Sequence, residues 1–378
     1  MKVLFLPHGA SEEEGDESDF IIEVSGEWPA HKVVKDDGLD GYFPPPFLAH
    51  GMLVVGDEKE RETAYERMAI SHNADFYGDC FGNVNRLLWE RKRDIAVKWI
   101  QKRKERFADF MAGFYNPDSV TSELDKEMMT HQYLHSFLCV LIEKETEKRI
   151  LSVSKEWGMI RTSAMSSFLD YAGSSDLFAD LRRSVHKCVT TFLKQLPMFL
   201  PALIMVSHMD SLDESAYGIS TLDVDIAVSL YKDMCETFTK SYALFVALDN
   251  MKTQGNFESF ENGKTGFEDV VGKIPNREKR EWLRSHSHDL FPIPLSEIIC
   301  DVMRNAEAHD GVSVDGLSQV ITFEDAHGGR TRMEKESFVR FAHRCIKGFN
   351  DILVVWENLY SVTKLTLIRN GETLHLRF

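Results

Sequence analysis

The chain has 378 residues, of which 43% are hydrophobic and 11% aromatic, so it can bury a sizeable core and is long for a single average domain. Its formal net charge of −16 argues, taken as a whole, against nucleic-acid binding, because phosphate contacts require clustered Lys and Arg. Its six cysteines form no CxxC or CxC pair, which argues against a disulfide-rich fold and favours a reducing, cytoplasmic setting. The longest apolar run, PMFLPALIMV, is about half of a membrane span, and the first residues do not resemble a signal peptide, so no membrane partner is expected.

The charge is unevenly distributed along the chain. Residues 1 to 60 contain fourteen Asp and Glu against four Lys, whereas residues 271 to 350 contain twelve basic residues, twelve acidic residues and five histidines. Residues 271 to 350 should therefore repel a polyanion such as a nucleic acid much less than the net charge of the whole chain suggests.

The first half of the chain predicts a short β-rich segment followed by helices. Residues 1 to 58 contain short alternating segments interrupted by Gly and Pro, which indicates a small β-rich or irregular unit. Residues 59 to 215 are predicted as a helical region. Apolar residues recur at helical spacing over 84–114, 119–157, 162–171, 175–193 and 197–208.

The second half, residues 216 to 378, predicts a further helical unit with β-hairpin insertions. Helices are expected over 222–251, over 277–288, from Pro294 to a stop at Gly311, and over about 335–360. The sequence VITFED at 320–325 and residues 331–333 are expected to pair as strands, and Asn370-Gly371 in an alternating tail predicts a C-terminal hairpin. The fold class is therefore mainly α with small β additions.

The sequence DVMRNAEAHDGV, residues 301 to 312, ends an apolar helix with an unusual set of polar residues. Asn305 and His309 are four residues apart, which places them on one side of a helix, where the amide could orient the imidazole. Arg304 lies about 140° from His309 around the helix, so the two converge only through the long arginine side chain or a loosened helix end. Alternatively, His309 is a satisfied core histidine and Arg304 a solvated residue of the last helical turn.

Arg304, Asn305 and His309 resemble the R-x4-6-H motif of the HEPN superfamily, in which a polar residue commonly follows the arginine. The order of an apolar helix, a β-hairpin and a long closing helix is similar as well, and the resemblance covers about residues 220 to 362. The bare pattern also occurs at RMAISH (67–72) and REWLRSH (280–286), but only RNAEAH (304–309) has the polar second residue, the small residues and the helix context.

The resemblance implies an HEPN-like helical bundle that forms a homodimer and brings two motifs together across a cleft. Catalytic members of the superfamily are metal-independent ribonucleases that use the 2′-hydroxyl of RNA as the nucleophile and leave a 2′,3′-cyclic phosphate. By this resemblance, His309 takes part in general acid/base catalysis, Arg304 binds the scissile phosphate and Asn305 orients one or both. RNA is the expected substrate, and no metal or other cofactor is expected.

Further basic residues of the same region are candidates for RNA binding, namely Arg280, Arg284, His288, Arg330 and Arg332. Because superfamily members often act in antiviral defence or as toxins, residues 59 to 215 are expected to sense a trigger, a regulatory protein or a ligand, or to restrain the nuclease. The alternative is a catalytically silent HEPN-like module that serves as a dimerising scaffold or binds a partner. Exposure of Arg304 and His309 in a shared cleft favours the enzyme, and a His309 sealed in the core favours the scaffold.

Three other motifs have weaker functional interpretations. NGKTG at residues 262 to 266 resembles the end of a phosphate-binding loop, but Glu258 stands where that loop requires glycine. His131 and His135 have the spacing of two metal ligands on a helix, yet no HExxH motif accompanies them. His286 and His288 point in different directions on a helix and are expected at a surface or a helix end.

Two stretches of the chain are strongly charged. NRLLWERKRDIAVKWIQKRKERF, residues 85 to 107, contains many more Lys and Arg than acids, interleaved with aromatic residues. We expect a solvated helix face with aromatic anchors in the core, and the alternative is a surface for an RNA backbone or a partner. The acidic residues 11 to 19 are expected to form a solvated loop, and the alternative is that they mimic nucleic acid in a basic groove.

Overall fold

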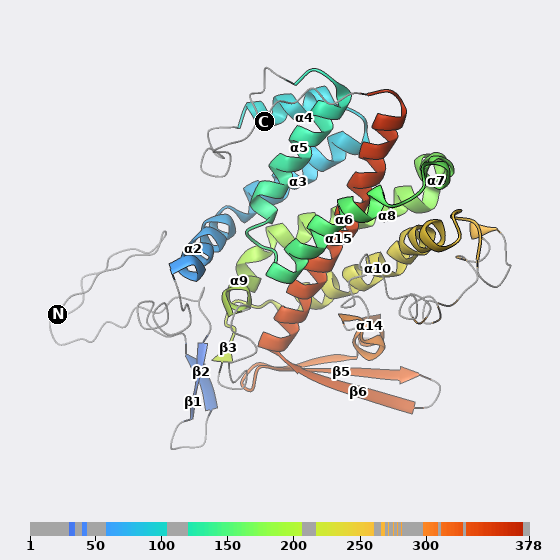
Figure 1. The fold of residues 1–378 in the computed structure, drawn as a ribbon. Helices are drawn as coiled ribbons and strands as arrows, with labels where there is room; N and C mark the ends of the chain where they lie inside the picture. The colour runs from blue at the N-terminus through green and yellow to red at the C-terminus, as the bar shows by residue number, and fades with distance from the viewer. Residues whose placement is uncertain are drawn as a thin grey trace.

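The computed structural model describes residues 30–34, 40–43, 58–103, 120–205, 217–260, 266–268, 298–308, 311–327 and 330–372, together with the single residues 271, 275, 278 and 281. Helices dominate these residues (Figure 1), so the predicted mainly α fold is confirmed. The helices are α2 (Glu58–His72), α3 (Ala74–Trp89), α4 (Arg93–Gln101), α5 (Glu123–Leu138), α6 (Lys144–Gly158), α7 (Thr162–Ser174), α8 (Asp176–Lys194), α9 (Leu196–Met205), α10 (Val224–Thr253), α14 (Asp301–Ala308) and α15 (Phe338–Arg369).

The long helix α15 is the centre of the fold. It begins where the side chain of Ser337 accepts a hydrogen bond from the Arg340 N–H at 3.1 Å, an N-cap that suits serine. Its middle is buried on almost every side, as expected of a helix in the core of a large protein. Helices α5, α6, α8, α9 and α10 pack against it (Figure 1), and Phe349 stacks on Phe192 of α8 with ring centroids 3.9 Å apart.

A single cluster of buried apolar residues extends from Ile70 in α2 to Val362 in α15. It contains residues of α3, α5 and α8 as well as residues of α10, α14 and α15. Among the residues that the structure describes, the boundary expected near residue 215 therefore does not separate two cores. The different roles of residues 59 to 215 and 216 to 378 remain a prediction.

Two small antiparallel sheets flank the helices. The first has the order β2-β1-β3, in which β1 (Ala30–Val34) pairs with β2 (Asp40–Phe43) and with β3 (Tyr217–Gly218). Strands are thus present in the predicted β-rich N-terminal segment, whose other residues up to 57 lie outside the described part. Because β3 lies just before α10, the pairing of β1 with β3 ties this segment to the second half of the chain.

The second sheet has the order β4-β5-β6, with β4 (Val312–Asp315), β5 (Val320–His327) and β6 (Arg330–Ser337). The predicted strand pair is confirmed as β5 and β6, which run antiparallel in continuous register from Val320 opposite Ser337 to His327 opposite Arg330. No strand is predicted at β4 from the sequence. Ile321 and Phe323 of β5 are fully buried, so one face of this sheet belongs to the core.

The single helix predicted over 119–157 is wrong, because the structure has two helices, α5 and α6, separated by residues 139 to 143. Side chains from helices distant in sequence form hydrogen bonds to the backbone of the segment between α5 and α6. The Arg67 guanidinium donates to the Val140 carbonyl at 3.0 Å, and the Asn350 side-chain oxygen accepts from the Glu143 N–H at 2.8 Å. Backbone groups at helix ends need such partners, and both Arg67 and Asn350 lie far from the break in sequence. The stretch predicted over 84–114 is likewise interrupted, at Arg91, where φ is +57°.

The C-terminal hairpin predicted around Asn370 and Gly371 is also wrong. Helix α15 continues to Arg369, and the Asn370 and Gly371 N–H groups donate to carbonyls of its last turn. Gly371 has a φ of +89°, the conformation in which glycine commonly ends a helix. The Asn-Gly pair therefore acts as a helix stop, and residues 373 to 378 lie outside the described residues.

Among the described helices, none is by itself both long and apolar enough to cross a bilayer; α8 and α9 meet those criteria only as a pair, and the chain bends by 81° between them.

Candidate functional site

Helix α14 lies between the second sheet and α10 (Figure 1). Its apolar side faces inward, with Val302 and Ala306 buried. The residues before it are held by Tyr231 of α10, whose hydroxyl donates to the Ile298 carbonyl at 2.7 Å and accepts from the Cys300 N–H at 2.9 Å. Burial raises the pKa of Tyr231, so this hydroxyl keeps the proton that it donates. Both α10 and the sheet therefore fix the position of α14.

Asn305 is tied to a buried carboxylate beneath the helix. Its side-chain amide donates to Asp325 Oδ2 at 3.2 Å, and the same oxygen accepts a hydrogen bond from the Arg332 guanidinium. Asp325 on β5 lies opposite Arg332 on β6 and is fully buried. A carboxylate in such a position needs a charged partner and hydrogen bonds, because burial without them is costly. The three residues together fix the orientation of the Asn305 side chain.

Arg304 lies next to Asn305 and has a different environment. Its side chain is half-buried, and its guanidinium makes no hydrogen bond or ion pair with any residue in the described part of the chain. The half-buried Arg344 and Arg149 are paired, with Glu336 and Asp351, whereas Arg182 of α8 resembles Arg304 in making no hydrogen bond or ion pair within the described residues. Since a guanidinium keeps its charge in proteins, Arg304 offers a set of uncommitted donors to an anion.

His309 lies outside the described residues, between Ala308 at the end of α14 and Gly311. The backbone of Gly311 is held on both sides, because its N–H donates to the Ala306 carbonyl at 2.8 Å and its carbonyl accepts from the Glu324 N–H at 2.7 Å. A Cβ added to Gly311 would lie 2.0 Å from the Glu324 carbonyl oxygen. Glycine is therefore required where the chain passes from helix to sheet.

Gly311→Ala is expected to destabilise the fold by about 1–3 kcal/mol, as overpacking at a rigid contact does. The added methyl group meets a backbone oxygen, which cannot move aside as a flexible side chain can. Urea unfolding measures the effect. Gly316→Ala is the matched control, because a Cβ at Gly316 would meet no atom within 4 Å. Equal stability of the two variants would contradict the close approach at Gly311.

Of the residues predicted to bind RNA, the structure brings Arg332 to Asn305 through Asp325. The other residues predicted to bind RNA fall outside what the structure describes: Arg280, Arg284, His288 and the side chain of Arg330. His286 and residues 262 to 265 of NGKTG also lie outside the described residues.

Asp325 is not among the predicted site residues, although the sequence contains a signal for it. In the strand VITFED, residues Ile321, Phe323 and Asp325 alternate and therefore share one face. An acid that follows two core positions on one face must have a partner. The sequence does not show which residues supply it, because Asn305 and Arg332 reach Asp325 only through the packing of α14 and β6 on β5.

His131 and His135 of α5 both contact Glu357 of α15. His131 Nε2 lies 3.1 Å and His135 Nδ1 lies 3.3 Å from the same oxygen, Glu357 Oε1. The His131 ring also stacks on Tyr360, at 3.5 Å between centroids, and on Trp356, at 4.6 Å. Within the described residues no group of three or more His, Cys, Asp or Glu is arranged to hold a metal ion. The two histidines therefore join α5 to α15 through a buried carboxylate.

Glu357→Gln is expected to lower the free energy of unfolding at pH 7 by about 3 kcal/mol. Burial acts to raise the pKa of Glu357, but the positive charges of His131 and His135 close to its carboxylate outweigh it and lower the pKa to about 2. Because the folded pKa lies below the ordinary value of 4.5, the stabilisation is complete above about pH 4.5 and is lost as the pH falls towards 2. Urea unfolding at several pH values measures both effects.

The control for this variant is Glu145→Gln, since Glu145 is exposed and pairs with Lys148 on the surface; its stability should change by less than about 0.5 kcal/mol. A Glu357→Gln protein as stable as the wild type at pH 7 would contradict the structural role of the carboxylate. Stabilisation of the wild type by zinc, absent in Glu357→Gln, would indicate a metal site instead.

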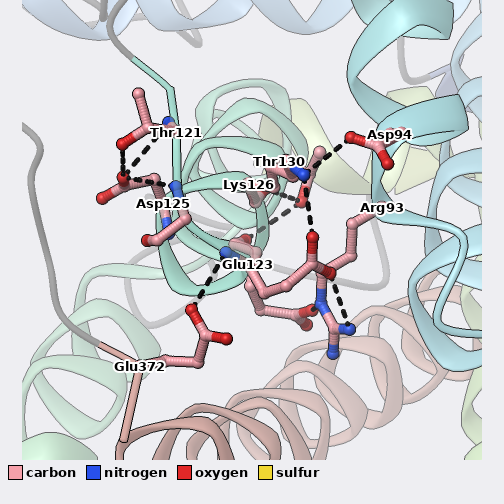
Figure 2. A network of polar contacts seen from close by, with 10 residues as sticks. Arg93, Asp94, Thr121, Glu123, Asp125, Lys126, Thr130 and Glu372 are labelled. Atoms are coloured by element: carbon pink, nitrogen blue, oxygen red, sulfur yellow. Dashed lines mark hydrogen bonds and ion pairs between the residues drawn. The ribbon is translucent and has the colours of Figure 1, made fainter.

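Part of the positive charge of the basic segment 85 to 107 is paired with acidic residues within the fold. Arg93 is buried and contacts Glu127 at 2.5 Å and Glu123 at 3.4 Å. Lys126 bridges Glu123 and Asp94 at 2.8 and 2.7 Å, which completes a network between α4 and α5 (Figure 2). The network favours a structural role for this end of the segment.

The aromatic residues of the described part of this segment support the same interpretation. Trp89 and Trp99 are half-buried, and Trp99 packs against the core and carries the Arg103 guanidinium 3.7 Å above its ring. Glu372, after the end of α15, accepts a hydrogen bond from the Glu123 N–H at 3.2 Å and joins the network (Figure 2). Residues 85 to 103 therefore fit a helix surface with aromatic anchors.

No protein-family model, curated protein or solved structure matches this chain. The resemblance to the HEPN superfamily thus rests on the motif at 304–309 and on the order of the elements around it.

Proposed function

We propose that this chain is a metal-independent endoribonuclease of HEPN type that acts as a homodimer through its C-terminal half. The observation that carries the proposal is the half-buried guanidinium of Arg304, which has no partner among the described residues. Asn305, beside it, is held by Asp325. The succession of α10, α14, β5, β6 and α15 supports the proposal as well, because it follows the order that the resemblance implies.

The chemistry needs two groups that the motif contains. The 2′-oxygen of the RNA forms a bond to phosphorus while the bond to the 5′-oxygen breaks, and the charge that builds on the phosphate oxygens is stabilised by the planar donors of Arg304. His309 gives a proton to the departing 5′-oxygen, and the 2′-hydroxyl loses its proton to water. Because His309 follows the end of α14, the helix C-terminus favours the charged imidazole that a proton donor requires.

Asn305 has a positioning role in this scheme. Its side-chain nitrogen donates a hydrogen bond to Asp325. Its side-chain oxygen can then accept a hydrogen bond from a donor at the site and orient that donor. The carboxylate of Asp325 in turn receives Arg332, so this arginine also helps to hold Asn305. Arg330, Arg280, Arg284 and His288 are proposed to contact the RNA backbone.

The setting follows from the resemblance. We place the protein in the cytoplasm, in antiviral defence or as a toxin, with residues 59 to 215 as the part that senses a trigger, binds a regulatory protein or ligand, or restrains the nuclease. Since one core joins this region to α10, α14 and α15, a ligand that shifts α3 or α8 would act on α14 through packed helices.

The second candidate is a catalytically silent scaffold. It is favoured by the fact that Asn305 and Arg332 both bind Asp325, because a buried hydrogen-bonded carboxylate has a sufficient structural role without any substrate.

Incubation of the purified protein with total RNA in excess EDTA distinguishes the candidates. The ribonuclease is expected to produce fragments with 2′,3′-cyclic phosphate and 5′-hydroxyl ends at a rate that EDTA does not change. If the RNA stays intact both with and without added divalent metal, the result supports the catalytically silent scaffold. Cleavage that EDTA abolishes would indicate a metal-dependent enzyme.

A further inference from the structure

β6 is an outer strand of the second sheet. Among the described strands it pairs only with β5, in a register that runs without a bulge from Arg330 to Ser337. Residues 331 to 335 are all exposed, the strand contains no proline, and it lies at the periphery of the molecule (Figure 1). A long, regular edge strand presents N–H and C=O groups that can pair with a strand of another chain.

The charges of β6 are arranged symmetrically about its centre. In the sequence RTRMEKES, two arginines precede Met333 and two glutamates follow it, all at alternate positions. If two copies pair antiparallel about Met333, Arg332 faces Glu334 of the partner subunit, and the same contact occurs again across the axis. The same register sets position 330 against position 336, but Glu336 is buried and paired with Arg344, so the complementary charges of the interface are those of Arg332 and Glu334. Opposite charges that face each other across antiparallel strands stabilise the pair.

The side chains at the centre of β6 are accessible to such a partner. Arg332 is 52% exposed although it binds Asp325, and a guanidinium has five N–H donors, so it can serve a second carboxylate. Glu334 is exposed, and Met333 is 52% exposed on the other face of the strand. The strand therefore offers an apolar residue at the axis and complementary charges beside it.

We propose that two copies of this chain join their β6 strands antiparallel about Met333 and form a continuous six-stranded sheet. The inference names the interface of the proposed homodimer and rests on that part of the proposed function, but it does not require that the dimer be catalytic.

The pairing has a consequence for the candidate site. The two-fold axis of an antiparallel strand pair is perpendicular to the sheet, so each subunit contributes the same face to the same side. Both α14 helices then lie over one face of the joined sheet, and the two β5 strands are about 14 Å apart, which is three strand spacings. The interface thus brings two copies of Arg304 to the same side of one sheet.

Sedimentation of the full chain over a range of concentrations tests the interface. The wild type is expected to dimerise as its concentration rises. Glu334→Arg is expected to weaken the dimer at least tenfold, because it sets arginine against arginine at both copies of the central contact. The matched control is Val314→Lys, which adds a charge to an exposed residue of β4, the opposite edge of the sheet, and should dimerise as the wild type does.

A wild type that stays monomeric at its highest soluble concentration would overturn the proposal. So would a Glu334→Arg protein that dimerises as tightly as the wild type, since the dimer would then form elsewhere. Circular dichroism checks that each variant is folded. Sedimentation measures mass and does not involve RNA, so failure of this interface and failure of the nuclease assignment are distinguishable.

Cysteine cross-linking tests the register. In a chain whose exposed Cys139 is replaced by serine, Met333→Cys is expected to form an intersubunit disulfide on mild oxidation, because position 333 faces itself. Thr331→Cys faces Lys335 of the partner subunit, and its own counterpart is four residues away, beyond the reach of a disulfide. Equal cross-linking of the two variants, or of neither, would overturn the register about Met333.

Discussion

Replacement of Arg304 by alanine is expected to slow RNA cleavage by about 100- to 1,000-fold, the usual loss when one preorganised donor to a developing charge is removed. In the folded chain the Arg304 guanidinium has no partner among the described residues, so its removal should change the free energy of unfolding by less than about 0.5 kcal/mol. Single-turnover cleavage assays and urea unfolding measure the two quantities on the same preparations.

Two further substitutions make the Arg304 prediction specific. Arg304→Lys keeps the charge but lacks the planar set of donors, so it should recover only part of the lost rate. Arg183→Ala is the matched control, because Arg183 is an exposed arginine of α8 that pairs with Asp180 on the surface. Full activity in Arg304→Ala would remove this residue from the site, and equal losses in both alanine variants would mean that only the overall positive charge matters.

His309→Ala is expected to slow cleavage by about 100- to 10,000-fold, because it removes the group that moves a proton in the reaction. If His309 and Arg304 act on one phosphate, their effects should not add: the double variant should be about as slow as the slower single variant. Additive losses would show that the two residues act at separate steps or sites. His131→Ala provides a comparison, since His131 contacts Glu357 and its replacement should lower the free energy of unfolding more than the rate of cleavage.

The sequence predicts the elements whose signals are local. The helix expected over 222–251 is α10, from Val224 to Thr253. The helix expected from Pro294 to Gly311 is wrong in its start, because Ile299 and Cys300 are not helical and α14 begins only at Asp301. Its apolar residues Val302 and Ala306 are buried as expected. The amphipathic period of these segments records which side faces the core. The helix expected over about 335–360 is α15, which begins a few residues later, after the N-cap Ser337, and continues to Arg369.

The errors occur where distant residues decide the structure. The break between α5 and α6 is held by Arg67 and Asn350, which lie far from it in sequence. At the C-terminus, Asn370-Gly371 suits either a hairpin turn or a helix stop, because both use a positive φ at glycine. Because α15 packs into the core, the helix continues to Arg369 and Asn370-Gly371 forms its stop.

The candidate site divides in the same way. Arg304, Asn305 and His309 are recognisable because they are close in sequence, and the structure places the first two side by side on α14. The support beneath them is not recognisable, because Asp325 and Tyr231 are brought to α14 from β5 and α10. The shared core of the two halves was not predictable either, since the packing of α8, α10 and α15 joins residues that lie far apart in the sequence.

The identity of the nucleophile provides the most direct test. An RNA oligonucleotide that the protein cleaves in EDTA is compared with the same oligonucleotide carrying a 2′-O-methyl group at the cleaved nucleotide. If the 2′-hydroxyl attacks the phosphate, the unmodified RNA yields a 2′,3′-cyclic phosphate and the methylated RNA stays intact at that position. Cleavage of both oligonucleotides at the same rate would contradict the account, whatever the effects of the Arg304 and His309 variants.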